Sequence, residues 1–170
     1  MANTHRFVTV LLGSAQQAGP ATGSIVRGMA RRMSDAEWRA FLMHGTRTGK
    51  LATARADGRP HVVPVWFVLD GDDIVFSTGG HSVKGRDLLR TGVAAMCVDD
   101  PHPPFAFVTV AGAVTISEDL DELGRWAKVI GARYMGERRG AEFGARNTAP
   151  GELLVRLHAE HVLAEADLTS

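Results

Sequence analysis

Apolar residues recur at two spacings along the chain, and the two spacings predict both helices and strands. A helix is expected from Ser34, where Glu37 three residues later completes a capping box. A second helix is expected over residues 82–90 and a third after Asp119, each opened by a residue type that caps helices well. The third has the clearest apolar stripe, formed by Leu120, Leu123, Ala127, Ile130 and Tyr134.

Strand patterns occupy most of the chain between these helices. We expect strands over residues 49–55, 61–69, 74–77, 93–98, 105–117 and 152–166. Asp57-Gly58 is a strong hairpin signal, and with Asp70-Gly71 it predicts a meander of three strands. Strands arranged in meanders, rather than in alternation with helices, predict a mainly β protein. The expected architecture is a small antiparallel barrel of six or seven strands with three flanking helices.

Two of the predicted strands have unusual features. Residues 61–69 are apolar at both alternating sets of positions, so we expect both faces to be covered, yet Pro64 requires an edge or a bulge. Residues 105–117 form the longest strand, and Gly112 in its middle predicts a bulge or a close backbone approach. A strand of this length is expected to bend, so that its two halves pair with different neighbours. Cys97, within another strand, is expected to be a buried and inert thiol.

Composition and charge exclude several classes of protein. The 170 residues have a formal net charge of zero, which argues against nucleic acid as a partner. The single cysteine gives no sign of an oxidising compartment, and no apolar run reaches the roughly 20 residues of a membrane span. We therefore expect a cytoplasmic protein.

Residues 1–32 differ from the rest of the chain. They contain no acidic residue, and residues 33–170 carry 15 basic and 19 acidic groups. The apolar run near the start is too short and too weakly flanked for a signal peptide, although a segment rich in arginine would also suit a transit peptide. We expect residues 1–32 to be a disordered extension, or to follow from an upstream start codon, and residues 33–170 to form the domain.

The sequence lacks the motifs of common catalytic and metal sites. His158 and His161 are three apart on a predicted strand, so they point to opposite faces and cannot bind one metal ion together. There is no nucleophile elbow, dinucleotide fingerprint or Walker loop. We assign no metal site and no catalytic acid or base. Arg138, in the segment 137–150 that is either a short helix or a lid, is offered only as a guess for a proton donor.

The stretch VFSTGGHSVKGRDLLR is the best candidate for a binding site. A strand runs into the turn Gly79-Gly80, and Ser82 then opens a helix that has two cations, Lys84 and Arg86, in its first turn. Cations are disfavoured there by the helix dipole, whereas a bound phosphate would favour them. Solvated cations at an ordinary turn remain the alternative. Beside the proline-bearing strand, such an anion site suits a flat cofactor with a phosphorylated tail.

These residues also resemble a known family. The segment from GKLATARADGRPHVVPVWFVLD to FSTGGHSVKGRDLLR is similar to the split β-barrel flavin and deazaflavin oxidoreductases, relatives of pyridoxamine 5′-phosphate oxidase. The greatest likeness is to the branch that uses the deazaflavin coenzyme F-420. The resemblance covers about residues 34–135 well and the last strand weakly. The chain ends HVLAEADLTS, without the arginine and tryptophan that hold the substrate phosphate in vitamin B6 oxidases, so that activity is not expected.

The resemblance implies a set of site residues and a function. Apart from Arg86, which we add on electrostatic grounds as a phosphate contact, it implies cofactor binding by His61, Val62, Val63, Pro64, Ser77, Thr78, Ser82 and Lys84. It further implies a homodimer with cofactor sites at the interface, and hydride transfer from reduced F-420 to an enone, quinone or tetrapyrrole. The alternatives are an FMN enzyme of the same fold and a non-catalytic protein that binds deazaflavin or tetrapyrrole. A haem protein is a weaker one, for which only His81 or His102 lies in a suitable loop.

Overall fold

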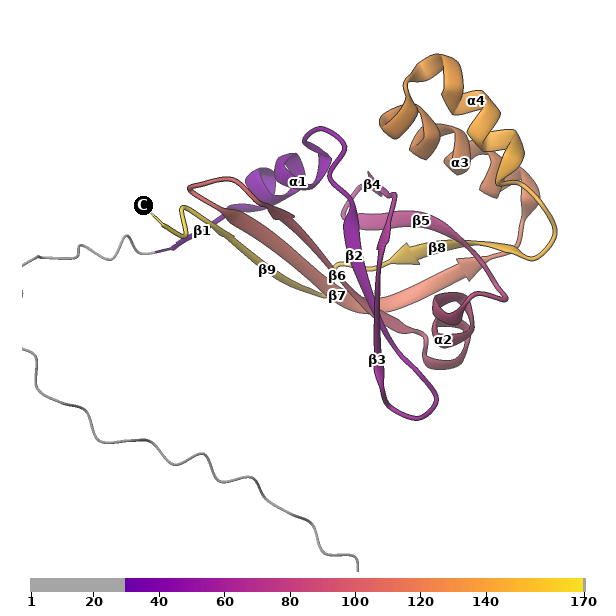
Figure 1. Ribbon diagram of the computed structural model, residues 1–170, viewed down its shortest axis with the longest axis horizontal. Helices are drawn as coiled ribbons and strands as arrows, with labels where there is room; N and C mark the ends of the chain where they lie inside the picture. The colour runs from indigo at the N-terminus through magenta and orange to yellow at the C-terminus, as the bar shows by residue number, and fades with distance from the viewer. Residues whose placement is uncertain (1–29, 170) are drawn as a thin grey trace, which may run out of the picture.

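The computed structural model describes residues 30–169, which form one curled antiparallel sheet with four helices packed around it (Figure 1). The elements in chain order are β1 (Arg31–Arg32), α1 (Asp35–Met43), β2 (Gly49–Ala54), β3 (Pro60–Val65), β4 (Val68–Asp70), β5 (Asp73–Gly79), α2 (Val83–Thr91), β6 (Val93–Asp100), β7 (Ala106–Ser117), α3 (Leu120–Met135), α4 (Glu137–Arg146), β8 (Glu152–Leu157) and β9 (His161–Ala166). The mainly β, split-barrel prediction is confirmed. The prediction for residues 1–32 lies outside the described residues except at its end, where β1 pairs with β9.

The sheet is organised around β7, the longest strand of the described chain. The strand order is β3-β2-β6-β7-β8-β5-β4, and β9 joins through a second pairing with β7. Phe107–Ala111 pairs with β9, and Val114–Ser117 pairs with β8. A Cβ atom added to Gly112, between these two halves, would lie 2.2 Å from the carbonyl oxygen of His158. The bend, the two sets of neighbours and the close backbone approach at Gly112 were all predicted, and all are confirmed.

The predicted strand 61–69 is interrupted, and the three-strand meander is therefore wrong. β3 pairs only with β2, and β4 pairs with β5 instead. The backbone groups of Phe67, at the break, are bonded to α3 rather than to a neighbouring strand. Its N–H donates to the Tyr134 hydroxyl at 3.3 Å, and its carbonyl accepts from the Arg133 guanidinium at 2.7 Å. Because α3 satisfies these groups, the strand can break without leaving buried polar atoms unpaired.

β3 is an edge strand, as Pro64 predicted, but only one of its faces is covered within the chain. The Val62 side chain is 60% exposed, so the expectation that both faces are buried is wrong for the single chain. The predicted strand 152–166 is also interrupted, because the chain passes from β8 to β9 opposite the bend in β7. These two breaks turn the six predicted strands into eight, and β1 is the ninth strand of the described residues.

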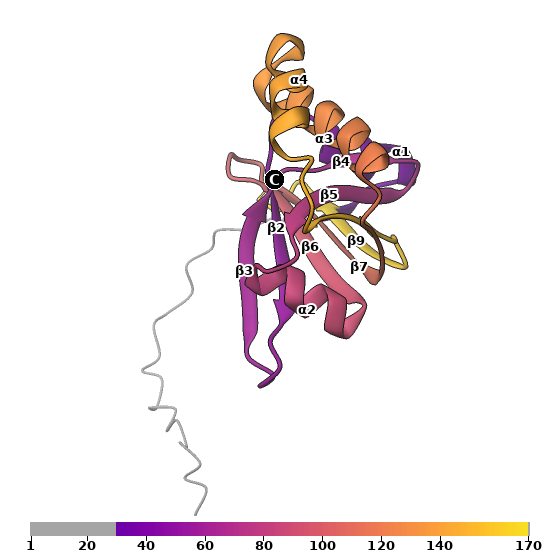
Figure 2. The same cartoon turned by 90° about the vertical axis from the view of Figure 1, so that its right-hand side faces the viewer.

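The helices begin and end close to their predicted residues. The capping box at Ser34 is present, Ser82 caps α2, and Gly92 ends α2 with φ 67°. Residues 137–150, for which a helix or a lid was expected, contain helix α4, and α4 packs tightly along α3. Figure 2 shows α3 and α4 at one end of the sheet and α2 near the β2–β3 hairpin. Cys97 is half-buried rather than buried, because it lies on the outer face of the sheet.

The core fills the inner side of the curled sheet. Trp38 and Leu42 of α1, Leu88 of α2, and the inward side chains of the strands form one cluster of buried residues. A smaller cluster, which includes Leu123 and Ile130, holds α3 against β4, β5 and β8. These two clusters fix the positions of α2 and α3 on either side of the end of β5, where the candidate site lies.

Candidate functional site

The turn between β5 and α2 is rigidly built. The Ser82 hydroxyl oxygen accepts a hydrogen bond from the Gly85 N–H at 3.0 Å and lies 3.2 Å from the Thr78 hydroxyl. A Cβ atom on Gly85 would lie 2.3 Å from the Gly79 carbonyl oxygen, so the first turn of α2 packs directly on the turn that precedes it. Only glycine permits that approach. The result is a fixed strand-to-helix junction with little freedom at Thr78, Ser82 or Gly85.

A cavity of about 330 Å³ lies beside this junction, and we call it the junction cavity. One wall is largely apolar and comes from the end of β3 and from α3 and α4; the other is polar and comes from β5, α2, β8 and the end of α4. Its lining residues are Pro64, Val65, Trp66, Ser77, Lys84, Ala127, Ile130, Gly131, Phe143, Asn147 and Glu152. A cavity with one apolar wall and a few convergent polar groups is the usual form of a small-molecule site.

Aromatic stacking holds the apolar wall in place. The Trp66 ring stacks on Tyr134, with centroids 4.8 Å apart and an interplanar angle of 2°, and it lies 5.1 Å from the Phe143 ring. The Tyr134 hydroxyl donates to the Arg47 carbonyl at 2.8 Å, and burial raises the pKa of Tyr134. The Arg133 guanidinium lies over the Tyr134 ring, and burial lowers the pKa of Arg133. Trp66 is therefore presented to the cavity by a packed support.

Three of the sequence-predicted residues line the junction cavity: Pro64, Ser77 and Lys84. Lys84 is half-buried and makes no hydrogen bond or ion pair with any residue in the described range. A half-buried lysine without a carboxylate partner is unusual, because desolvation of its charge is left without compensation. Thr78 is only 5% exposed and Ser82 serves as the helix cap, so these two hydroxyls shape the site next to Lys84 without lining the cavity.

The structure does not bring Arg86 to the same cavity as Lys84. Residues two apart on a helix point about 200° apart around its axis, so these two cations lie on opposite sides of α2. Arg86 donates to the His81 carbonyl at 2.6 Å and faces the β2–β3 hairpin. The two cations are neighbours in the sequence, but the helix separates them.

The remaining predicted residues lie along β3 and outside the junction cavity. His61 lies 3.5 Å from the Arg55 side chain, Val62 faces outward, and Val63 packs against the core. Because β3 pairs with β2 alone, the backbone groups of Val62 lie on the free edge of the sheet, whereas those of His61 and Val63 face β2. Any contact of this strand with a ligand through its backbone would be made at that edge.

Several lining residues were not identified from the sequence as site residues. Phe143 and Asn147 come from the segment for which a helix and a lid were both considered, and Glu152 begins a strand 68 residues after Lys84. No local pattern marks these residues, because Phe143 and Asn147 are placed by the packing of α4 on α3 and Glu152 by the pairing of β8 with β5. Arg138, the guess for a proton donor, is exposed and does not line the cavity.

A second cavity, of about 430 Å³, lies on the other side of α2, and we call it the arginine cavity. Two of its four arginines have carboxylate partners: Arg59 pairs with Asp57 at 2.7 Å, and Arg90 lies 3.6 Å from Asp87. Arg55 and Arg86 form no ion pair with a carboxylate among residues 30–169. The arginine cavity therefore has an excess of positive charge.

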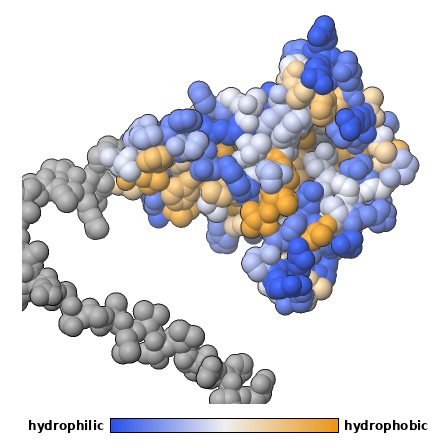
Figure 3. All heavy atoms as spheres, viewed as in Figure 1, coloured by the Kyte–Doolittle hydropathy of each residue, from blue (hydrophilic) through white to orange (hydrophobic). Residues whose placement is uncertain are grey.

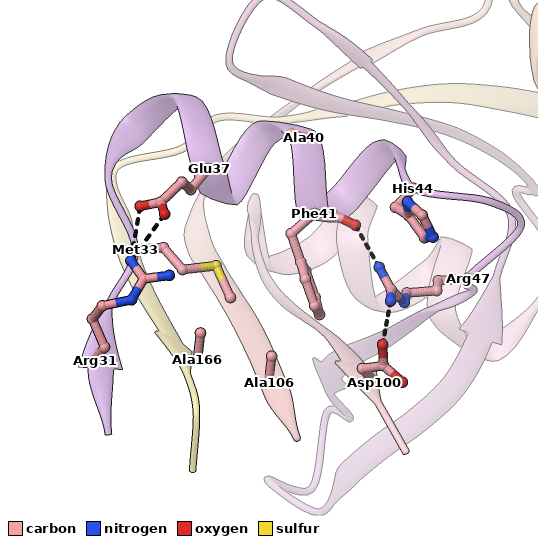
Figure 4. A pocket seen from close by; sticks show the side chains of 10 residues that line it. All are labelled: Arg31, Met33, Glu37, Ala40, Phe41, His44, Arg47, Asp100, Ala106 and Ala166. Carbon is pink, nitrogen blue, oxygen red and sulfur yellow. Dashed lines mark hydrogen bonds and ion pairs between the residues drawn. The ribbon is translucent and has the colours of Figure 1, made fainter. Parts of the chain in front are cut away.

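A third cavity lies between α1 and the sheet, and its charged groups are already paired (Figure 4). At one end Arg31 pairs with Glu37 at 2.9 Å. At the other end Arg47 pairs with Asp100 and donates to the Phe41 carbonyl at 3.1 Å. The hydrogen bonds of His102 and Arg47 lower the pKa of Asp100. Because these charges satisfy one another, this cavity is a weaker candidate for binding a charged ligand.

Other kinds of site are not found in the described residues. Between residues 30 and 169, no three His, Cys, Asp or Glu side chains are placed to hold a metal ion. Within the same range no helix combines the length and apolarity required to cross a bilayer.

Comparison with known proteins agrees with the fold. The conserved hypothetical protein Rv2991 from Mycobacterium tuberculosis is 25% identical, with a TM-score of 0.70 over 79% of this chain and 86% of that one. A structure described as an F420 reductase is 26% identical, with a TM-score of 0.57 over 72% of this chain and 94% of that one. An FAD-binding protein from Mesorhizobium loti, at 19% identity and TM-score 0.60 over 81% and 96% of the chains, shares the fold.

The sequence profile described as pyridoxamine 5′-phosphate oxidase matches residues 34–165, which is most of the chain. No curated protein sequence matches. The profile match and the split barrel agree with the resemblance seen in the sequence. The chain belongs to the pyridoxamine 5′-phosphate oxidase family.

Proposed function

We propose that this protein is a reductase that uses the deazaflavin coenzyme F-420. The observation that carries the proposal is the unpaired, half-buried Lys84 in the junction cavity, with the excess positive charge of Arg55 and Arg86 across α2. When bound, the coenzyme would supply a hydride from its C5 carbon to an electron-poor double bond, as in an enone, quinone or tetrapyrrole. The protein binds, orients and shields the reactants.

The residues of the junction cavity fit a phosphorylated planar cofactor. The apolar wall, from Pro64 to Trp66, provides a surface for a ring, and the edge of β3 provides backbone groups for its polar atoms. Lys84 and the half-buried hydroxyl of Ser77 would bind the phosphate. The free N–H groups at the start of α2 add to the positive potential at this point.

The arginine cavity favours F-420 over FMN. FMN ends at its phosphate, whereas F-420 continues past its phosphate into a tail that bears carboxylates. A ligand whose phosphate lies at Lys84 and whose tail passes the start of α2 would meet Arg86 and Arg55, which form no ion pair in the described structure. The similarity to an F420 reductase supports the same choice.

We also propose a homodimer formed through the outer face of the sheet. Side chains in register on β2, β6 and β7 are the small residues Ala52, Ala95 and Ala111. Val62 and Val93, on the same face, are 60% and 55% exposed. Figure 3 shows apolar surface over the strands of the molecule. An exposed apolar patch of this kind is typical of an interface between subunits.

Sedimentation velocity of the wild type and of Ala95→Glu tests the dimer. We expect a dimer for the wild type and a folded monomer for the variant, because a charge would be buried at the centre of the interface. A monomeric wild type at micromolar concentration would refute this part of the proposal.

Cofactor titration tests the assignment directly. Trp66 lines the junction cavity, so binding should quench tryptophan fluorescence. We expect F-420 to bind more tightly than FMN, and Lys84→Ala to weaken both by about 1.5–3 kcal/mol. The double variant Arg55→Ala, Arg86→Ala should weaken F-420 only, and Lys128→Ala, an exposed lysine outside the cavity, serves as the control. Failure of the wild type to bind either cofactor would refute the proposal, and tighter binding of FMN would favour the FMN alternative.

A further inference from the structure

The polar wall of the junction cavity contains an acid where a phosphate site alone would exclude one. Glu152, the first residue of β8, lines the cavity together with Lys84. An added Cβ atom on Gly79, its partner on β5, would lie 3.4 Å from Glu152 Oε1, so the carboxylate lies over the end of β5, two residues from Ser77. A carboxylate in contact with a bound phosphate would repel it.

Glu152 is not placed there to neutralise Lys84. The two side chains line the same cavity but are too far apart to form an ion pair, and Glu152 makes no side-chain hydrogen bond within residues 30–169. Asn147, at the end of α4, also lines the cavity, and only its backbone N–H is bonded, to the Phe143 carbonyl at 3.0 Å. The cavity therefore holds an acceptor and an amide, both half-buried and both without partners in the described chain.

We infer that Glu152 and Asn147 bind the hydroxyl groups of a polyol chain that joins the ring of the cofactor to its phosphate. This inference rests on the proposed function and adds to it the recognition of the middle of the ligand. A ligand between the apolar wall and Lys84 must present an anion to Lys84 and hydrogen-bond donors to Glu152. Hydroxyl groups are such donors, and their bonds to an ionised carboxylate are short and strong. The amide of Asn147 both donates and accepts, which also matches hydroxyl groups.

The test uses two matched series of ligands with the full-length protein. The flavin series is lumiflavin, riboflavin and FMN, which are the ring alone, the ring with its polyol, and the complete phosphorylated molecule. The deazaflavin series is the N10-methyl ring, the ring with its polyol, and F-420. Affinities are measured by tryptophan quenching for the wild type, Glu152→Gln, Glu152→Ala and Asn147→Ala. Glu118→Gln is the control, because Glu118 is exposed and lies outside the cavity.

We expect Glu152→Ala to weaken the polyol compounds by about tenfold or more, as for the loss of a hydrogen bond to a charged group, and to leave the ring compounds unchanged. Asn147→Ala should have a smaller effect in the same direction. Unchanged binding of the polyol compounds to Glu152→Ala would overturn the inference. So would a rise in FMN or F-420 affinity on Glu152→Gln with unchanged riboflavin affinity, since Glu152 would then only repel the phosphate.

A different result decides the proposed function. It fails if FMN and F-420 both fail to bind the wild type, and the inference then fails with it. If both bind, Lys84→Ala weakens them, and Glu152→Ala leaves the polyol compounds unchanged, the proposed function stands and the inference alone is refuted.

Discussion

Replacement of Arg133 by methionine should destabilise the protein strongly, because Arg133 joins three parts of the chain. Its guanidinium donates to the Leu42 carbonyl at 2.6 Å, the Phe67 carbonyl at 2.7 Å and the Gly45 carbonyl at 3.1 Å. It also lies over the Phe67 ring, 4.6 Å from the centroid. Methionine keeps the apolar stem of the side chain but removes every donor.

The expected loss follows from these bonds. The two partly buried bonds, to Leu42 and Phe67, are each assigned about 1.5–2 kcal/mol, the lower part of the range for charged hydrogen bonds. The exposed bond to Gly45 adds little, so the total is about 3–4 kcal/mol. That is a large fraction of the stability of an ordinary domain. Arg133→Lys should lose somewhat less, because it keeps a charged donor, but its single ammonium group cannot replace a guanidinium fork that reaches all three carbonyls.

Urea unfolding followed by tryptophan fluorescence measures the effect. Arg125→Met is the control, since Arg125 is an exposed arginine on the same helix. A loss of less than about 1 kcal/mol for Arg133→Met would show that α3 does not hold the break after β3 through this side chain, and the explanation of that break would be refuted.

Three further predictions concern stability. Gly112→Ala should cost about 1–3 kcal/mol, because its Cβ atom would lie 2.2 Å from the His158 carbonyl oxygen, and thermal unfolding measures this. Burial raises the pKa of Tyr134, so its contribution to the free energy of unfolding is complete below about pH 10 and is lost as pH rises through the folded pKa. The stability of Tyr134→Phe should therefore fall less steeply with pH above about pH 10. The backbone N–H of Ser34 is the main cause that lowers the pKa of Glu37. The contribution of Glu37 to the free energy of unfolding is present above about pH 4.3 and is lost as pH falls through the folded pKa. The stability of Glu37→Gln should therefore fall less below about pH 4.3 in acid titrations followed by circular dichroism.

The sequence predicted the features that depend on neighbouring residues. The caps at Ser34 and Ser82 and the glycine stop at Gly92 were all predicted, because each rests on contacts within about four residues. The bend at Gly112 could be predicted from strand length and a single glycine. The break at Phe67 could not, because the two residues between β3 and β4 are apolar like their neighbours. The side chains of α3 that bond the Phe67 backbone are 66 and 67 residues away.

In the candidate site, too, the residues placed by local structure could be predicted and those placed by long-range packing could not. Lys84 and Ser77 lie in one local strand–turn–helix unit, and the structure places both on the junction cavity. Arg86 was grouped with Lys84 by sequence distance, whereas the helix places it on the opposite side. Glu152 and Asn147 reach the cavity only through the packing of α4 on α3 and the pairing of β8 with β5. No pattern in the sequence encodes that packing directly.

The two prolines of β3 have a consequence for how copies of this chain can associate. The Arg55–Arg59 hydrogen bond that closes the hairpin sets which backbone groups of β3 face β2. By this register, the backbone groups of residues 60, 62 and 64 point away from β2, which suits the prolines because they have no N–H to donate. Two of these three positions are prolines, so Val62 alone offers a donor along this edge. Another strand could add there only with a ladder that lacks two of the three hydrogen bonds β3 would donate. The edge is thus protected against extension of the sheet and amyloid-like growth, while its carbonyl oxygens remain open to small molecules.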